Sequence, residues 1–290
     1  MRTTFIDRQK EDSFTNDGYC VVGLLNLTRL EEVRKVIGEL GFGIDSKIRF
    51  RNSINQESVE TKNQIFEKLS PIFQSEVDNF LQDYKILRIA IFDLLPGGSG
   101  IRAHQHANLV DESKFRSLTI WSPLIDTTVE MGTLHVIKGS HKIFNHVRSP
   151  NDYHAFDDVS KKVIKKYSTP LLLKAGQGVI LDDRLIHWSP PNKSSRIRTA
   201  IQLELIPQEA ELVICYRAND QELLKNATNE ICYREAAPPI NRPDKMQVIG
   251  RLNQATVSYK NKQFISMMQT IHSDSPSQKG NLFKRLFVNK

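Results

Sequence analysis

Residues 116–137 read RSLTIWSPLIDTTVEMGTLHVI, two short β-rich runs separated by polar residues and a glycine at position 132. Runs that are rich in β-branched and aromatic residues and end at turn residues are typical of strands. Many short strands with frequent turn signals predict a β-sandwich or barrel. The same texture continues on both sides of this stretch, in KILRIAIFDLL (85–95), TPLLL (169–173), GVILDD (178–183) and RTAIQLELI (198–206).

Helical patterns precede this β-rich region. The segment TRLEEVRKVIGEL (28–40) repeats apolar residues near a 3.6-residue period and predicts an amphipathic helix with Thr28 as its N-cap. A second helical stretch lies within residues 57–83, and we expect Pro71 to interrupt it because proline cannot donate the helical hydrogen bond.

The C-terminal part of the chain also reads as helical, in QELLKNATNEI (221–231) and in residues 250–271, before a polar and basic tail. Within the β-rich region, the lysine-rich segment 151–167 predicts a loop with a short helix. We therefore expect one domain over residues 1–290. Its parts are an N-terminal helical region (1–84), a β core (85–207) and a C-terminal helical extension with a basic tail (208–290).

The composition excludes several classes of protein. Of the 290 residues, 39% are hydrophobic and 25% are charged, which is typical of a soluble protein with a sizeable core. There is no apolar run of membrane-spanning length and no signal-peptide pattern at the start, so a cytoplasmic location is expected. The three cysteines form no CxxC pair, so neither a disulfide framework nor a zinc site is indicated. The net charge is +7, but no nucleic-acid-binding motif accompanies it.

Three of the eight histidines favour a metal site by their positions in the sequence. His104 and His106 are separated by one residue, so both side chains lie on the same face of an extended segment. They follow the glycine-rich turn PGGSG (96–100), and His187 ends the apolar run GVILDDRLI (178–186). Two strands of one barrel could bring these three imidazoles to one metal ion. The alternative is a structural role, which is the commoner role of a single histidine.

The segments around these histidines resemble a known family. AHQHANLVDESKFRSLTIWSPLIDTTVEMGTLHVIKGSHK (103–142) is similar to the core of the phytanoyl-CoA dioxygenase-like family, whose members typically read H-x-D, a tryptophan strand ending P-L-x-D, a glycine-containing turn and G-S-H. GQGVILDDRLIHWSPPNKSSRIR (176–198) resembles the distal segment of the family, with a late histidine, S-x-P-N and an arginine. The resemblance spans about residues 85–207, and FTNDGYCVVGLL (14–25) is similar to the family's start.

The resemblance implies a mainly β fold with flanking helices, the double-stranded β-helix or cupin-like jelly-roll barrel. It also implies a non-haem oxygenase that uses Fe(II), 2-oxoglutarate and O2. Carried over by position, His104 and His187 become iron ligands. Arg198 would pair with the distal carboxylate of 2-oxoglutarate, a task that suits the planar fork of a guanidinium.

Three further residues are placed in the same pocket by the resemblance. Ser189, two residues after the late histidine, could add a hydrogen bond to the cosubstrate. Thr119 and Trp121, on the tryptophan strand, would line the pocket. His135 and His141 are expected to be structural, and so is the acidic pair Asp111 and Glu112.

One position departs from the family pattern, because His106 stands where the family has an aspartate. The usual two-histidine, one-carboxylate site would become a site with three neutral ligands, and iron would keep one more positive charge. The alternative is that His106 points away and two histidines hold the metal. We favour ligation by His106.

The predicted function is hydroxylation or desaturation of a small molecule or of a CoA- or carrier-linked metabolite. The altered position His106 motivates an alternative, a related protein that binds metal or a small acid without oxygenase turnover. A third option is a cupin-type isomerase or dioxygenase that needs no cosubstrate. The basic excess agrees with a phosphate-bearing substrate, and the sequence indicates neither the substrate itself nor an oligomeric state.

Overall fold

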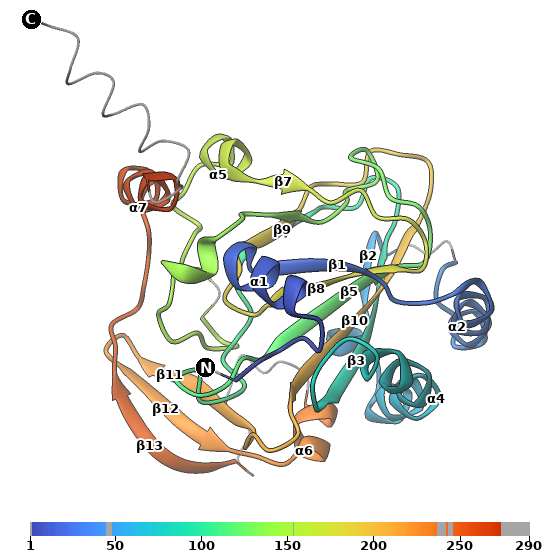
Figure 1. Cartoon of the computed structure of the whole chain (residues 1–290), viewed down its shortest axis with the longest axis horizontal. Coiled ribbons are helices and arrows are strands. Elements are labelled where there is room, and N and C mark those ends of the chain that lie inside the picture. Colours follow the sequence, from blue (N-terminus) through green and yellow to red (C-terminus); the bar gives the residue numbers. More distant parts are fainter. Residues whose placement is uncertain (1, 45–47, 153, 237–241, 243–245, 274–290) are drawn as a thin grey trace, which may run out of the picture.

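The computed structural model describes residues 2–44, 48–152, 154–236, 242 and 246–273. The predicted basic tail beyond residue 273 lies outside this part of the chain. Among the described residues, no helix is long and apolar enough to cross a membrane. Two antiparallel sheets face one another, and a third, smaller sheet lies beside them (Figure 1).

The larger sheet contains six strands in the order β1-β8-β5-β10-β3-β2. Its edge strand β1 comes from the N-terminal region and pairs with β8, with Cys20 opposite Ile180. The central strand β10 pairs with β5 on one side and β3 on the other. The bounds are β1 (Tyr19–Gly23), β2 (Phe50–Asn52), β3 (Tyr84–Leu94), β5 (Leu118–Pro123), β8 (Gln177–Asp182) and β10 (Arg198–Pro207).

The smaller facing sheet has the order β4-β9-β6-β7. From β3 to β10 the chain passes repeatedly between the two sheets, and this connectivity is that of a jelly-roll. These strands form a barrel whose interior lies between the two sheets, and β1 and β2, from the region predicted to be helical, extend its larger sheet. The bounds are β4 (Ile101–His104), β6 (His135–Val136), β7 (Thr169–Pro170) and β9 (His187–Ser189).

Alternation along β10 separates the core from the barrel interior. Ile201, Leu203 and Leu205 are buried in the main hydrophobic cluster, whereas Arg198 and Gln202 line a pocket on the opposite face. Successive side chains of a strand point to opposite faces, so one strand supplies both the apolar support and the polar lining.

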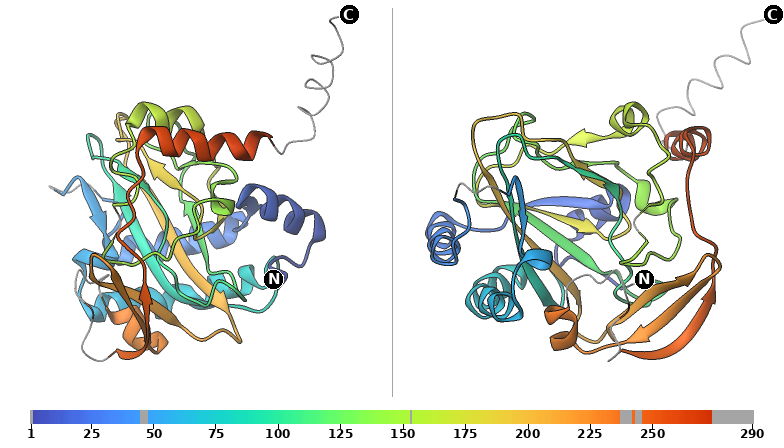
Figure 2. Two further views of the ribbon diagram at one scale, coloured as in Figure 1. Left: turned by 90° about the vertical axis from the view of Figure 1, so that its left-hand side faces the viewer. Right: turned by 180° about the vertical axis from the view of Figure 1, so that it is seen from behind.

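Helices cover the outer face of the larger sheet (Figures 1 and 2). Helix α2 (Leu27–Glu39) buries Leu30 and Val33, and α4 (Val59–Val77) buries Leu69 and Phe73, all in the main hydrophobic cluster. The short helix α1 (Arg8–Asp17) precedes α2 in the sequence, and α3 (Ser53–Gln56) lies between α2 and α4.

Helix α2 begins earlier than the sequence predicted. Its N-cap is Asn26, whose side chain accepts a hydrogen bond of 2.9 Å from the backbone N–H of Arg29. The prediction that Thr28 caps this helix is therefore wrong. Asparagine caps a helix at least as well as threonine, and the extended backbone at Asn26 suits that position.

Helix α4 continues through Pro71, so the predicted interruption is wrong. A proline inside a helix costs about 3 kcal/mol. The apolar face of α4 buries Ile65, Leu69 and Phe73 completely. Each such side chain contributes about 1.5–3 kcal/mol when buried, which together exceeds the cost of the proline.

The C-terminal region is only partly helical. Strands β11 (Val213–Asn219), β12 (Glu222–Ala227) and β13 (Gln247–Asn253) form an antiparallel sheet, with β12 in the middle. Helix α6 (Glu230–Glu235) follows β12, and α7 (Asn261–Ser273) follows β13. The helix predicted at 221–231 is wrong up to Ala227, because pairing on both edges of β12 outweighs the local helical preference. The helix predicted at 250–271 is confirmed only from Asn261 onward, since β13 extends to Asn253.

Two helices lie at the outer side of the smaller sheet (Figure 1). One is α5 (Lys161–Tyr167), the short helix predicted within the lysine-rich segment, and the other is α7. Phe264 of α7 stacks on Phe144 with ring centroids 5.2 Å apart. A short 3-10 helix, Ser140–Lys142, follows β6.

Candidate metal centre and anion pocket

Three histidines meet at the barrel: two come from the HxH motif and one from the late strand. His104 ends β4 and lies opposite His187, the first residue of β9, in the antiparallel register. His106 follows two residues later in the chain. One nitrogen from each side chain can be chosen so that all three lie within 4.8 Å of one another. Among the described residues, this histidine cluster is the one group of three such side chains that could hold a metal ion.

Hydrogen bonds orient the histidine cluster. His104 Nδ1 lies 2.8 Å from the carbonyl oxygen of Arg102, and His187 Nδ1 lies 2.9 Å from that of Leu185. A carbonyl oxygen only accepts, so these Nδ1 atoms carry the protons and each Nε2 is the unprotonated ring nitrogen. The Nε2 atoms of His106 and His187 are 3.2 Å apart, a separation that suits two ligands of one metal ion.

Burial keeps two of these imidazoles neutral. Desolvation, with a smaller contribution from His106, lowers the pKa of His104 to about 4. Desolvation, together with the neighbouring histidines of the cluster, places the pKa of His187 well below its usual value. Neutral imidazole is the form that binds a metal ion, so the donor set fits a transition metal such as Fe(II) at neutral pH.

The opposite end of the same pocket holds a buried cation. Arg198, the first residue of β10, is 1% exposed, and burial lowers its pKa to about 10. Its guanidinium donates to the carbonyl oxygen of Gly132 and lies 3.4 Å from Ser189 Oγ. Its Nε has no hydrogen-bond partner, and no described acidic side chain forms an ion pair with it. A buried cation without a counter-ion is costly, so this position favours an anionic ligand.

A glycine and a tryptophan shape the surroundings of Arg198. Gly132 has a φ of 72°, and a Cβ there would lie 2.4 Å from the carbonyl oxygen of Pro190, so a larger residue is excluded. The guanidinium carbon of Arg198 lies 5.3 Å from the centre of the Trp121 ring, within the range of a cation–π contact.

One pocket between the two sheets contains all seven residues that the sequence singled out. Its free volume is about 40 Å³, which is room for a few water molecules. The lining includes the histidine cluster, Thr119, Trp121, Ser189 and Arg198, together with Phe92, Ile101, Leu134, Leu181, Trp188 and Gln202. We call it the cosubstrate pocket.

Sequence reasoning missed three polar residues at this site. Gln202 lines the pocket and lies two positions from Ala200 on the inner face of β10, so counting in steps of two from Arg198 would have found it. Trp188 lines the pocket with a buried Nε1 that has no partner. Asp183 touches both His106 and Thr119, and no sequence motif marks it.

A buried ion pair lies further along the larger sheet. Arg88 on β3 and Glu204 on β10 are directly opposite in the register and form two hydrogen bonds of 2.9 Å. Tyr233 of α6 donates to Glu204 at 2.6 Å. This helical residue from the C-terminal region thus closes a polar network against the barrel strands.

The residues expected to be structural are held in local contacts. His141 Nε2 bonds the carbonyl oxygen of Thr15, and the buried His135 packs against Trp188 with ring centroids 4.5 Å apart and the ring planes tilted by 38°. Glu112 pairs with Arg148.

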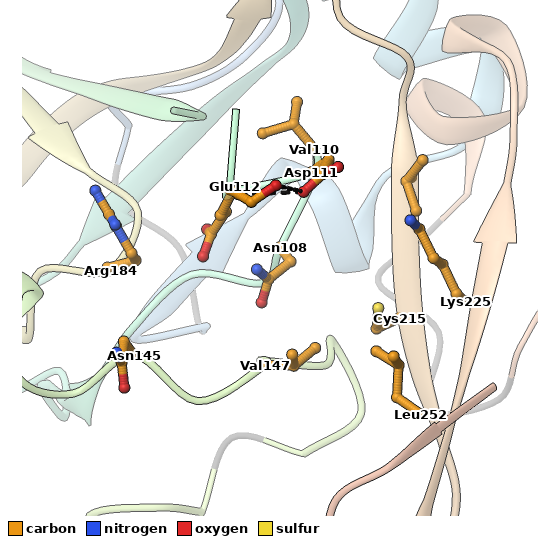
Figure 3. A pocket seen from close by; sticks show the side chains of 12 residues that line it. Asn108, Val110, Asp111, Glu112, Asn145, Val147, Arg184, Cys215, Lys225 and Leu252 are labelled. Atoms are coloured by element: carbon orange, nitrogen blue, oxygen red, sulfur yellow. Dashed lines mark hydrogen bonds between the residues drawn. The ribbon is translucent and has the colours of Figure 1, made fainter. Parts of the chain in front are cut away.

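A second cavity lies between the segment 108–113 and the C-terminal sheet. Its volume is about 380 Å³, and it shares no lining residue with the cosubstrate pocket. Figure 3 shows Arg184, Asn108 and Glu112 on one side and Lys225, Cys215 and Leu252 on the other. The charged groups Arg184 and Glu112 are already paired, with Asp182 and Arg148 respectively.

The fold and the site together define a class of protein, a jelly-roll protein in which three histidines that could hold a metal ion share one pocket with a buried arginine. Residues 14–200 match the model of the family described as phytanoyl-CoA dioxygenase (PhyH). The chain therefore belongs to this family of dioxygenases, and the family and enzyme class predicted from the sequence are confirmed.

Curated relatives agree with this assignment. A phytanoyl-CoA dioxygenase from Arabidopsis thaliana is 25% identical over 193 residues, which is 62% of this chain and 67% of that protein. Phytanoyl-CoA dioxygenase 1 from Oryza sativa subsp. japonica is 28% identical over 192 residues, with the same two shares.

Solved structures confirm the predicted fold class. EvdO2 from Micromonospora carbonacea var. aurantiaca, complexed with 2-oxoglutarate, has a TM-score of 0.51 at 20% identity and covers 70% of this chain and 91% of that chain. HygX from Streptomyces hygroscopicus, with nickel and 2-oxoglutarate bound, has a TM-score of 0.52 at 16% identity and covers 70% of this chain and 88% of that chain.

Proposed function

We propose that this protein is a non-haem Fe(II)- and 2-oxoglutarate-dependent dioxygenase whose iron ligands are His104, His106 and His187. The observation that carries the proposal is the pairing of two complementary sites in one pocket. Three clustered imidazoles stand at one end, and a buried guanidinium without an anionic partner stands at the other. EvdO2 and HygX, which share the fold, were crystallised with 2-oxoglutarate.

Arg198 is the proposed anchor of the cosubstrate. Its free Nε and the neighbouring Ser189 hydroxyl provide donors for the distal carboxylate of 2-oxoglutarate. The gain in free energy comes from neutralising a cation that is already buried. Because the free volume is only about 40 Å³, binding of the dicarboxylate requires side chains of the pocket to move.

The side chains around the histidine cluster perform the remaining tasks. The carbonyl oxygens of Arg102 and Leu185 hold two imidazoles in the tautomer that presents Nε2 to the centre. Thr119, beside His106, and Trp121, beside Arg198, line the pocket and would limit the access of water to the reacting centre. When bound, the metal and cosubstrate supply the oxidising chemistry, in which a substrate C–H, O2 and 2-oxoglutarate become C–OH, succinate and CO2.

The substrate is proposed to be a small molecule. The relatives from Arabidopsis and rice are named after a CoA thioester, phytanoyl-CoA. A phosphate-bearing carrier would be attracted by the lysine pairs of α5, Lys161–Lys162 and Lys165–Lys166. This part of the proposal is tested by measuring how much 2-oxoglutarate the protein consumes in the presence of a free acid and in the presence of the CoA thioester of the same acid.

The experiment for the main proposal is succinate formation from 2-oxoglutarate in the presence of Fe(II), O2 and a panel of small molecules. We expect succinate above the protein-free background for the wild type and none for His104→Ala. Fe(II) binding without succinate under every condition would instead favour the alternative, a protein that binds metal or a small acid without turnover.

A further inference from the structure

The replacement of the family's aspartate by His106 removes a negative charge from the metal site. The three proposed ligands are all imidazoles, so the site relies on neutral donors alone. A carboxylate nevertheless lies directly behind His106. Asp183 Oδ1 is 3.3 Å from His106 Nδ1, and the Asp183 side chain is 1% exposed.

A relay through Thr119 connects this carboxylate to the imidazole. Thr119 Oγ1 donates to Asp183 Oδ1 at 2.7 Å, and His106 Nδ1 lies 2.7 Å from the same Thr119 oxygen. An ionised carboxylate only accepts hydrogen bonds, so it fixes the threonine proton on the side of Asp183. The threonine oxygen then accepts from His106 Nδ1, and His106 Nε2 faces the cluster without a proton.

The backbone holds the same two residues together. The N–H of His106 donates to the carbonyl oxygen of Asp183 at 2.9 Å, and the carbonyl oxygen of His106 accepts from Arg148 Nε at 2.7 Å. His106 lies beyond the end of β4, so these bonds replace the support of a strand ladder. Both the orientation and the tautomer of His106 therefore depend on the segment that contains Asp183.

The second carboxylate oxygen of Asp183 is buried and has no hydrogen-bond partner. A buried polar atom without a partner is costly and rarely retained without a reason. Here the negative charge on Asp183 would be offset by a cation held at the histidine cluster, on the far side of the His106 ring. Carboxylates that accept from a metal-bound histidine raise the basicity of that ligand.

We propose that Asp183 is a positioning residue that acts through His106 and restores to the metal site the negative charge that the aspartate-to-histidine change removed. The pair His106–Asp183 thus takes the place of a directly ligating carboxylate, with the charge moved one side chain away from the metal. This inference rests on the metal centre of the proposed function.

The test is a double-substitution cycle read by metal affinity, without turnover. Fe(II) is titrated anaerobically into the full chain, without 2-oxoglutarate, for the wild type, Asp183→Asn, His106→Asp and the double variant H106D/D183N. Asp183→Asn is expected to weaken Fe(II) binding about 10- to 100-fold. In His106→Asp the new carboxylate lies beside that of Asp183, and the two negative charges repel each other. The double variant removes this repulsion, so it is expected to bind Fe(II) more tightly than either single variant.

Asp182→Asn is the matched control. Asp182 is the preceding residue, is 2% exposed and pairs with Arg184 rather than with the histidine cluster. Its replacement is expected to lower the melting temperature while leaving Fe(II) affinity within about twofold of the wild type. Equal losses of affinity in D182N and D183N would overturn the proposal, because the effect would then be a general one of lost buried charge.

Two further results would also contradict it. One is an unchanged Fe(II) affinity in D183N, and the other is a double variant in which the two single effects simply add. If D183N does not fold, the comparison of H106D with H106D/D183N still decides, because the proposal requires the second to bind more tightly. A wild type that binds no Fe(II) would instead reject the metal centre itself, so the two failures are distinguishable.

Discussion

His104 and His187 stand opposite each other across the β4–β9 ladder, and their ring centroids are 4.3 Å apart. The pairing of the two strands, rather than a flexible loop, therefore sets the distance between two of the proposed ligands. A site built on paired strands is well ordered before any ligand binds. The third histidine and the buried arginine line the same pocket, in which we propose that the metal ion and the cosubstrate bind.

Arg198→Ala is expected to weaken 2-oxoglutarate binding at least about 100-fold, because a buried bidentate partner of the carboxylate is lost. Arg198→Lys should recover part of the affinity, since a lysine keeps the charge but not the planar fork. Isothermal titration with Ni(II) in place of Fe(II) measures both without turnover. Arg196→Ala is the control, because Arg196 is exposed, and an equal loss there would argue against a specific anchor.

His146 predicts a pH dependence of stability that is separate from the metal centre. Burial, with smaller contributions from Arg148 and Arg217, lowers its pKa to about 4. Between that value and the ordinary histidine pKa of about 6.5, the unfolded chain binds more protons than the folded one, so stability falls as the pH falls.

The effect should be on the order of 1–2 kcal/mol between pH 7 and pH 5. Thermal melts of the metal-free wild type and of His146→Gln at the two pH values isolate it, because His104 and His187, whose pKa values are also lowered, contribute equally to both proteins. His146→Gln should reduce the difference in melting temperature, whereas His154→Gln, at a side chain that is 63% exposed, should not. A pH dependence that is identical in all three proteins would refute the assignment to His146.

The buried pair Arg88–Glu204 predicts a large effect of a small change. Glu204→Gln preserves the shape of the side chain but leaves Arg88 without its counter-charge, which costs about 3–5 kcal/mol. The free energy of unfolding in urea measures the loss. The matched control is Glu222→Gln, which breaks the pair with Arg251, whose side chain is 67% exposed, and should cost less than about 1 kcal/mol. Similar costs at both positions would contradict this account of the network.

The N-cap of α2 offers a test between two neighbouring residues. Asn26→Ala should reduce stability by about 1 kcal/mol, because the N–H of Arg29 loses its acceptor. Thr28→Ala should change it by less than about 0.5 kcal/mol, since Thr28 is an exposed residue inside the helix. The reverse order of the two effects in chemical denaturation would show that the cap is at Thr28 after all.

The sequence predicted those parts of the site that strand periodicity and motif spacing describe. The one-residue spacing of His104 and His106 and the position of His187 at a strand end indicated a shared site, and the family resemblance favoured it over a structural role. Arg198 followed from the family resemblance. Asp183 could not be found in this way, because its role depends on the loop after β4 folding back onto the end of β8.

The errors in the fold have a similar cause. Residues 221–227 carry two adjacent leucines and a lysine that favour a helix locally, but β12 has a partner strand on each edge. Pro71 has a known local cost that the core contacts of α4 outweigh. In both cases tertiary contacts between distant segments decide, and a single sequence does not display those contacts.

The most direct measurement is a crystal structure of the full chain grown anaerobically with Fe(II) and 2-oxoglutarate. We expect one iron bonded to a nitrogen of each of His104, His106 and His187, with the distal carboxylate of 2-oxoglutarate on Arg198. Iron bound elsewhere, a His106 ring turned away from the iron, or a cosubstrate that does not meet Arg198 would contradict the account.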